Sequence, residues 1–120
     1  MSHPVLWFEV LGNDGARLQQ FYSRLFGWKI DADNPMKYGH VEHEGGRGIP
    51  GGVGSATPGT RSWVTFYVET PDPAATLTEV ERLGGRTVMP VRELSDDTTI
   101  AVFEDPEGHV VGLVKEKPAV

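Results

Sequence analysis

The order of predicted elements along this chain occurs twice, and this internal repeat is what most limits the folds open to it. Each half begins with a strand of alternating apolar residues, continues with an amphipathic helix and ends with three further strands. The predicted strands are 5–11, 28–31, 36–43 and an irregular one near 49–53 in the first half, and 63–69, 86–93, 98–104 and 109–116 in the second half. A strand followed by a helix and three strands is a β-α-β-β-β module, so the sequence predicts an α+β fold of two tandem modules.

The two helices have recognisable ends. In the first half, Asn13 and Asp14 offer caps and Gly27 offers a stop, while Leu18, Phe21, Tyr22 and Leu25 follow helical spacing and predict a buried stripe. In the second half the cap is Asp72, Pro73 suits the first helical position, and the stop is Gly84-Gly85. The apolar stripe there consists of Leu77, Val80 and Leu83.

The predicted boundary between the modules lies in a segment rich in glycine and proline. We expect one domain over 1–120, with a first module at about 4–54, a junction at about 44–61 and a second module at about 62–116. The first strands carry Phe8, Val10, Val64, Phe66 and Val68 on the face expected to lie under the helices. Their other faces carry Trp7 and Glu9 in the first strand and Trp63, Thr65 and Tyr67 in the second.

Composition excludes several functional classes. The 120 residues contain no cysteine, which removes disulfides, thiolate nucleophiles and cysteine metal sites. The net charge of −6 opposes phosphate backbones and anionic membrane surfaces, so we expect neither nucleic acid nor membrane as a partner. No apolar run approaches the length of about 18 residues that a membrane span needs, and the chain is expected to be cytoplasmic.

Four segments together resemble the vicinal oxygen chelate superfamily, also called the glyoxalase, bleomycin-resistance and extradiol dioxygenase superfamily. These segments are Trp7-Phe8-Glu9-Val10, Phe21-Tyr22-Ser23-Arg24-Leu25-Phe26-Gly27-Trp28, Gly48-Ile49-Pro50-Gly51-Gly52 and Phe103-Glu104-Asp105-Pro106-Glu107-Gly108-His109-Val110-Val111-Gly112-Leu113. The resemblance covers the whole chain. It implies that the modules form an open, curved sheet enclosing a cleft, usually in a homodimer.

The same resemblance implies a divalent metal in active members, held by His, Gln or Glu from the first and last strands of each module. In this chain those positions fall on Trp7, Trp63, Gly52 and Gly112. Trp7 is expected to be equivalent to Trp63 in the other module, and Gly52 to Gly112. None of these residues can coordinate a metal, because an indole only donates and glycine has no side chain. The chain is therefore expected to be a small member without the usual metal ligands and without a cofactor.

The first functional hypothesis is a metal-free protein that binds an aromatic or cationic small molecule in the cleft between the modules. The ligand-binding candidates are Trp7, Glu9, Trp63, Thr65 and Tyr67, because aromatic side chains stack on planar or cationic ligands and a carboxylate or phenol orients polar groups. The same tryptophans could instead fill the core between the modules. In that case the chain would be an interaction or assembly subunit.

The alternative hypothesis is an enzyme, such as a lyase, an isomerase or a dioxygenase-like protein. Glu9 and His40 are its catalytic candidates, with Glu9 acting as a general base. A divalent metal would require a relocated site, for which Glu9, His40 and Glu42 are the candidates, since His40 and Glu42 share one face of a strand whereas His43 faces the other way. The sequence leaves open whether any reaction is catalysed.

Overall fold

The computed structural model describes residues 2–42, 46–57, 61–94 and 97–117. Within these ranges the chain forms eight strands and two helices. In chain order they are β1 (Val5–Gly12), α1 (Gly15–Phe26), β2 (Ile30–Asp31), β3 (Gly39–Val41), β4 (Gly51–Ser55), β5 (Trp63–Thr70), α2 (Pro73–Arg82), β6 (Arg86–Glu93), β7 (Thr99–Glu104) and β8 (Val110–Lys115). The predicted α+β class and the repeated β-α-β-β-β order are confirmed.

Contacts divide the chain into two compact units. One unit comprises Trp7–Thr65, and the other comprises Met1–Leu6 together with Phe66–Val120. The division cuts through β1 and β5, because the start of the chain contacts the second unit: the Pro4 carbonyl accepts a hydrogen bond of 2.9 Å from the Glu69 N–H. The organisation of 1–120 as a single domain stays a prediction.

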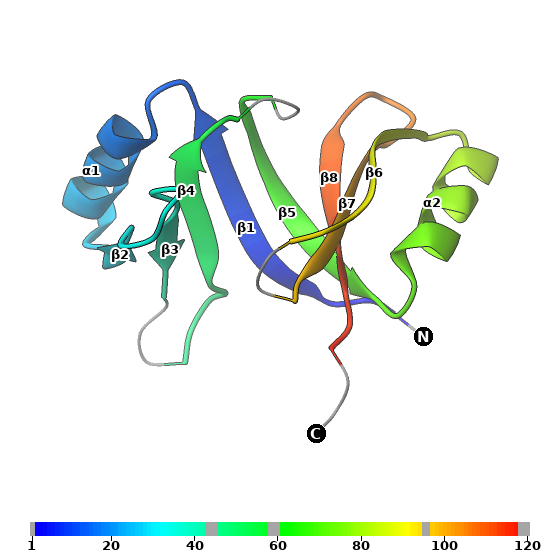
Figure 1. Cartoon of the computed structure of the whole chain (residues 1–120), viewed down its shortest axis with the longest axis horizontal. Coiled ribbons are helices and arrows are strands. Elements are labelled where there is room, and N and C mark those ends of the chain that lie inside the picture. Colours follow the sequence, from blue (N-terminus) through cyan, green and yellow to red (C-terminus); the bar gives the residue numbers. More distant parts are fainter. Residues whose placement is uncertain (1, 43–45, 58–60, 95–96, 118–120) are drawn as a thin grey trace. The chain divides into compact units, whose positions relative to one another are not determined.

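In the Trp7–Thr65 unit, the strands follow the order β2-β3-β4-β1 and α1 lies against this sheet, chiefly beside β4 (Figure 1). The β1 and β4 strands are parallel, with Glu9 opposite Gly52, and β3 runs antiparallel to β4, with His40 opposite the same glycine. Asp14 caps α1 by accepting from the Arg17 N–H, and Gly27 ends the helix with a φ of 72°. Both predicted helix ends are therefore confirmed.

Three strands of this unit differ in length or regularity from the prediction. The expected strands 28–31 and 36–43 are reduced to β2 and β3, and residue 43 lies outside the described residues. The expected irregular strand near 49–53 is instead the regular strand β4, whose residues 51–54 are all buried. Glycine is favoured at positions 51 and 52, because a Cβ atom there would overlap the Phe8 ring and the Tyr38 hydroxyl, respectively, and would force these side chains to shift.

The buried face of α1 is rotated relative to the predicted stripe. Leu18 and Tyr22 are half-buried as expected, whereas Phe21 is 55% exposed and Leu25 is 57% exposed. The reason is a polar anchor: the side-chain amide of Gln19 donates to the Val53 carbonyl at 2.7 Å, which turns the Gln19 side of the helix toward β4. The prediction that Phe21 and Leu25 belong to the buried stripe was wrong.

In the second unit, the strands follow the order β5-β8-β7-β6, and α2 packs on β6, β7 and β8 (Figure 1). The β5 and β8 strands are parallel, with Tyr67 opposite Gly112. Leu77 of α2 meets Ala101 and Leu113 in the core of this unit. Asp72 and Pro73 begin α2 as predicted, but Leu83 is 64% exposed and does not belong to the buried stripe.

Two residues predicted to lie in the core of β5 are on the surface. Val64 is 78% exposed and Phe66 is 43% exposed, whereas Val68 packs against the core of the second unit and Phe8 packs against the Trp28 ring. The α2 helix packs mainly on β6, β7 and β8, and of these three β5 residues Val68 is the one that lies against the core containing Leu77. Among the described residues, neither helix has the length and apolarity that would let it cross a membrane.

Candidate functional site

Glu9 presents a buried carboxylate at the middle of β1, with only 7% of the residue exposed. Its Oε1 accepts a hydrogen bond of 2.8 Å from the Trp63 indole N–H, and its Oε2 accepts one of 2.8 Å from the Tyr38 hydroxyl. A buried carboxylate is costly unless donors replace its water. These two bonds are therefore part of what allows Glu9 to lie inside the unit.

Tyr38 joins Glu9 to the second indole of this unit. The Tyr38 hydroxyl accepts a hydrogen bond of 3.0 Å from the Trp7 Nε1, so the polar groups form a chain from Trp7 through Tyr38 and Glu9 to Trp63. The Asn34 side chain holds the Tyr38 backbone from both sides, donating to its carbonyl at 2.8 Å and accepting from its N–H at 2.9 Å. We call this set of hydrogen-bonded residues the Glu9 network: Trp7, Tyr38, Glu9 and Trp63.

Sequence reasoning identified Trp7, Glu9 and Trp63 as site residues but missed Tyr38. The Tyr38 residue precedes β3, and its side chain reaches the network by lying over Gly52. A tyrosine near a glycine-rich strand is a weak signal without the strand register. The pairing of β3 with β4 brings Tyr38 to this strand, where its hydroxyl fills the space that a side chain at Gly52 would need.

A row of residues crosses the sheet next to the Glu9 network. The ladders place Asp31 opposite His40, His40 opposite Gly52, and Gly52 opposite Glu9. Directly paired residues on neighbouring strands lie on the same face, so this row defines what we call the Glu9 face. Its His40 ring is exposed and makes edge-to-face contacts with Trp7 at 6.0 Å and with Tyr38 at 5.2 Å between ring centroids.

A hollow of about 360 Å³ adjoins the Glu9 face. Its lining residues are Lys29, Ile30, Asp31, His40 and Glu42. Two carboxylates, the Lys29 ammonium and an imidazole make most of this lining polar, and His40 connects the hollow to the aromatic rings of the Glu9 network. With two carboxylates against one ammonium, the arrangement suits a ligand with a cationic group next to a planar one.

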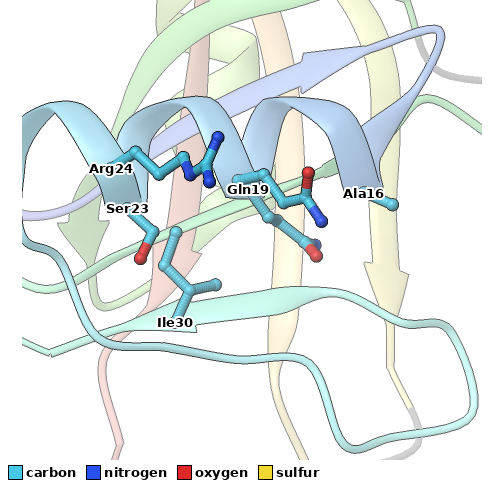
Figure 2. Close-up of a pocket in the computed structure, with 6 residues that line it drawn as sticks. Ala16, Gln19, Ser23, Arg24 and Ile30 are labelled. Atoms are coloured by element: carbon cyan, nitrogen blue, oxygen red, sulfur yellow. The ribbon is translucent and has the colours of Figure 1, made fainter.

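A second hollow, of about 480 Å³, lies between α1 and β2 and is shown in Figure 2. Its lining residues are Ala16, Gln19, Gln20, Ser23, Arg24 and Ile30. Two of its polar groups already serve the fold: the Gln19 amide donates to the Lys37 and Val53 carbonyls, and the Ser23 hydroxyl donates to the Trp28 carbonyl at 2.9 Å. This hollow is therefore a weaker candidate than the one beside His40.

The remaining predicted ligand-binding residues are buried within their strands. Thr65 and Tyr67 are each 7% exposed. Tyr67 belongs to the second unit, where its ring lies against Gly112, the residue opposite it on β8.

The candidates for a relocated metal site do not converge. No three His, Cys, Asp or Glu side chains in the described parts of the chain form a group that could hold a metal ion. Glu9 and His40 are separated by β4, and since neighbouring strands lie about 4.8 Å apart their backbones are roughly 10 Å apart. The exposed Glu42 follows the end of β3, two residues beyond His40.

The residues at the positions implied for a metal do not fit one either. The Trp7 and Trp63 indoles donate to Tyr38 and Glu9, and a Cβ atom at Gly52 would overlap Tyr38. The strand bounds and the helix caps also correct the predicted equivalence of Trp7 and Trp63. The first strands, Val5–Gly12 and Trp63–Thr70, and the caps Asp14 and Asp72 match at an offset that pairs Trp63 with Val5 rather than with Trp7.

Outside this face, the turn before β8 contains a perturbed carboxyl group. Donation from the His109 backbone N–H, followed by donation from the Glu107 N–H, holds the pKa of Asp105 below its usual value, although partial burial opposes the shift. Both N–H groups donate to Oδ1 at 2.9 Å, and the His109 Nδ1 lies 3.0 Å from Oδ2. These bonds, together with the one from the Gly108 N–H to the Asp105 carbonyl, close the turn at residues 105–108.

The sequence matches a known protein family, and the fold matches solved structures. A family model described as a glyoxalase-like domain matches residues 8–114. The chain is 28% identical over 116 residues to CFP32 of Mycobacterium bovis and Mycobacterium tuberculosis, a protein provisionally named a glyoxylase. That match covers 89% of this chain but only 43% of the relatives, so the chain spans less than half of their length.

Two solved structures illustrate the likeness of the fold. A glyoxalase/bleomycin resistance protein/dioxygenase superfamily member from Vibrio splendidus 12B01 superposes with a TM-score of 0.64 at 15% identity, covering 96% of this chain and 100% of that chain. Methylmalonyl-CoA epimerase from Mycobacterium tuberculosis superposes with a TM-score of 0.65 at 14% identity, covering 95% of this chain and 88% of that chain. Identities this low show a shared fold and no more.

Proposed function

The chain belongs to the glyoxalase-like domain family, as its sequence motifs predicted, and from this premise we propose that it is a metal-free protein that binds a small molecule. The proposed ligand is aromatic or cationic and lies on the Glu9 face of the Trp7–Thr65 unit. No activity of the longer relatives is assumed for this chain.

The observation that carries the proposal is the contact of the His40 ring with two members of the Glu9 network at the edge of a polar hollow. Aromatic rings offer a planar ligand stacking or edge contacts, and they attract a cation through the negative face of the ring. Asp31 and Glu42 place two carboxylates beside His40 in the lining of the hollow. A ligand with a positive group attached to a ring would satisfy both parts.

The hydrogen bonds of Glu9 favour binding over general-base catalysis at this residue. A general base must receive a proton from the substrate at hydrogen-bond distance. Both oxygens of the Glu9 carboxylate already accept hydrogen bonds from side chains of the protein. The bonds instead support a role in which Glu9 fixes the indole of Trp63 and the phenol of Tyr38.

The proposal can be tested with benzamidinium, a planar aromatic cation, and with neutral benzamide as its matched probe. We expect benzamidinium to change the tryptophan fluorescence with saturation, and to bind more tightly than benzamide. The variants Asp31→Asn and His40→Ala should each weaken benzamidinium binding by about fivefold or more, equivalent to roughly 1 kcal/mol. The exposed Val64→Ala serves as a control outside the proposed site.

Two results would contradict the proposal. Equal binding of both probes that is insensitive to Asp31 and His40 would remove the assigned site. A stoichiometric transition metal in protein purified without chelators, together with probe binding that is lost on chelation, would remove its metal-free character.

A further inference from the structure

Position 52 is the place on the Glu9 face where a third metal ligand would have to stand. It lies between Glu9 on β1 and His40 on β3, directly paired with both. Paired side chains on adjacent strands are close enough to interact, whereas residues two strands apart are separated by roughly 10 Å of backbone. A side chain at this position is needed to connect the carboxylate with the imidazole.

Glycine and tyrosine together close this place. Gly52 contributes no side chain, and the Tyr38 hydroxyl occupies the space that a Cβ atom at position 52 would require. The phenol is held there by a hydrogen bond to Glu9, by one from Trp7, and by the two bonds between its own backbone and Asn34. The Glu9 carboxylate therefore accepts a hydrogen bond from a neutral hydroxyl at the place where a ligand from position 52 would stand.

We infer that Tyr38 is the specificity-determining residue of the Glu9 face: seated over Gly52, it takes the place of a metal ligand and commits this face to metal-free binding. The inference rests on the proposed function and names the residue responsible for it. It also explains why Glu9 and His40 share a face without forming a metal site within the described residues.

The inference predicts that a metal site appears when the phenol is removed and a ligand is supplied. In Tyr38→Ala/Gly52→Glu, two carboxylates and the His40 imidazole would stand on three adjacent strands of one face. Three oxygen and nitrogen donors of this kind suit Ni²⁺ or Zn²⁺. Gly52→Glu alone should not create the site, because its side chain meets Tyr38.

The experiment is calorimetric titration with NiCl₂ and with ZnCl₂. We expect Tyr38→Ala/Gly52→Glu to bind metal at least about tenfold more tightly than wild type, Tyr38→Ala or Gly52→Glu. Adding His40→Ala should reverse most of the gain. The control Tyr38→Ala/Ser62→Glu adds the same charge at an exposed position and should gain nothing.

A second measurement keeps the inference testable if the double variant does not fold, as judged by circular dichroism. Gly52→Ala should lower Tm by at least about 4 °C in wild type and by clearly less in a Tyr38→Ala background, because the clash partner is then absent. Equal losses in the two backgrounds, or a folded double variant without any gain in metal binding, would overturn the inference.

The two proposals fail in distinguishable ways. A double variant that gains no metal leaves benzamidinium binding by wild type untouched. The proposed function, in contrast, is tested on wild-type protein alone. It is contradicted by the metal content of that protein or by its binding of benzamidinium and benzamide, as described above.

Discussion

Glu9 illustrates how one residue can be identified from a sequence while its role is decided by its neighbours. Strand alternation placed it on the same face as Trp7, and this placement agrees with the structure. The sequence offered it as a ligand contact, a metal ligand or a general base. Its hydrogen bonds to Tyr38 and Trp63 instead make it the centre of an internal network.

The network gives a prediction about stability. Tyr38→Phe removes one donor to the buried Glu9 carboxylate and the acceptor of the Trp7 indole N–H, so it should lower the free energy of unfolding by about 1–3 kcal/mol. Urea denaturation measures this change. Tyr22→Phe removes the same atom from a side chain that engages mainly through ring stacking, and it should cost much less. Equal costs would show that the hydroxyl of Tyr38 is not held as described.

Asp105 gives a prediction about pH. Its pKa is depressed in the folded chain, mainly by the His109 N–H, so its stabilising effect is present above the unfolded pKa of about 3.9 and is lost as the pH falls through the folded value. Asp105→Asn should therefore reduce the loss of Tm on acidification below about pH 4. An unchanged acid slope in this variant would argue against the depressed pKa.

At the scale of elements, α1 shows that helical spacing predicts a helix more reliably than its orientation. The apolar residues of α1 recur as a helix requires, and the cap and stop lie where they were expected. The helix contacts β4 through the side that contains Gln19 because that amide bonds to the β4 backbone. Phe21, Leu25 and Phe26 are left more than half exposed.

This orientation can be checked by substitution. Phe21→Ser and Leu25→Ser should each change the free energy of unfolding by no more than about 0.5 kcal/mol, since both side chains are already largely in water. Tyr22→Ala should cost about 2 kcal/mol, because its ring stacks on Phe26 and Trp28. Thermal or urea unfolding distinguishes the two cases. A large loss at Phe21 would restore the stripe predicted from the sequence.

At the scale of the whole molecule, the homodimer implied by the family resemblance stays a prediction. We expect light scattering to give twice the mass of one chain. The exposed apolar residues of α1 and β5 would then be tested by Phe21→Ser/Leu25→Ser and by Val64→Ser, one of which should shift the mass toward that of a single chain. A single-chain mass for wild type at every concentration would contradict the expectation. The cytoplasmic location is likewise a prediction.

The sequence by itself determined the repeated order of elements, the helix ends and the family, and it pointed to Trp7, Glu9, Trp63 and His40 as candidates for a site. These features depend on local chemistry: alternation of apolar residues, capping side chains, glycine at a left-handed helix end, and motifs contiguous in the chain. These predictions agree with the structure because each feature is specified by residues that are close together in the chain.

Only the tertiary structure decided the register of Gly52 with Glu9 and His40, the seat of Tyr38 over that glycine, and the side of α1 that is buried. The physical reason is that these features depend on pairs of residues far apart in the chain. A shift of register by one residue would have sent each side chain to the opposite face. The absence of a side chain at Gly52 became meaningful only when the structure showed which phenol fills its place.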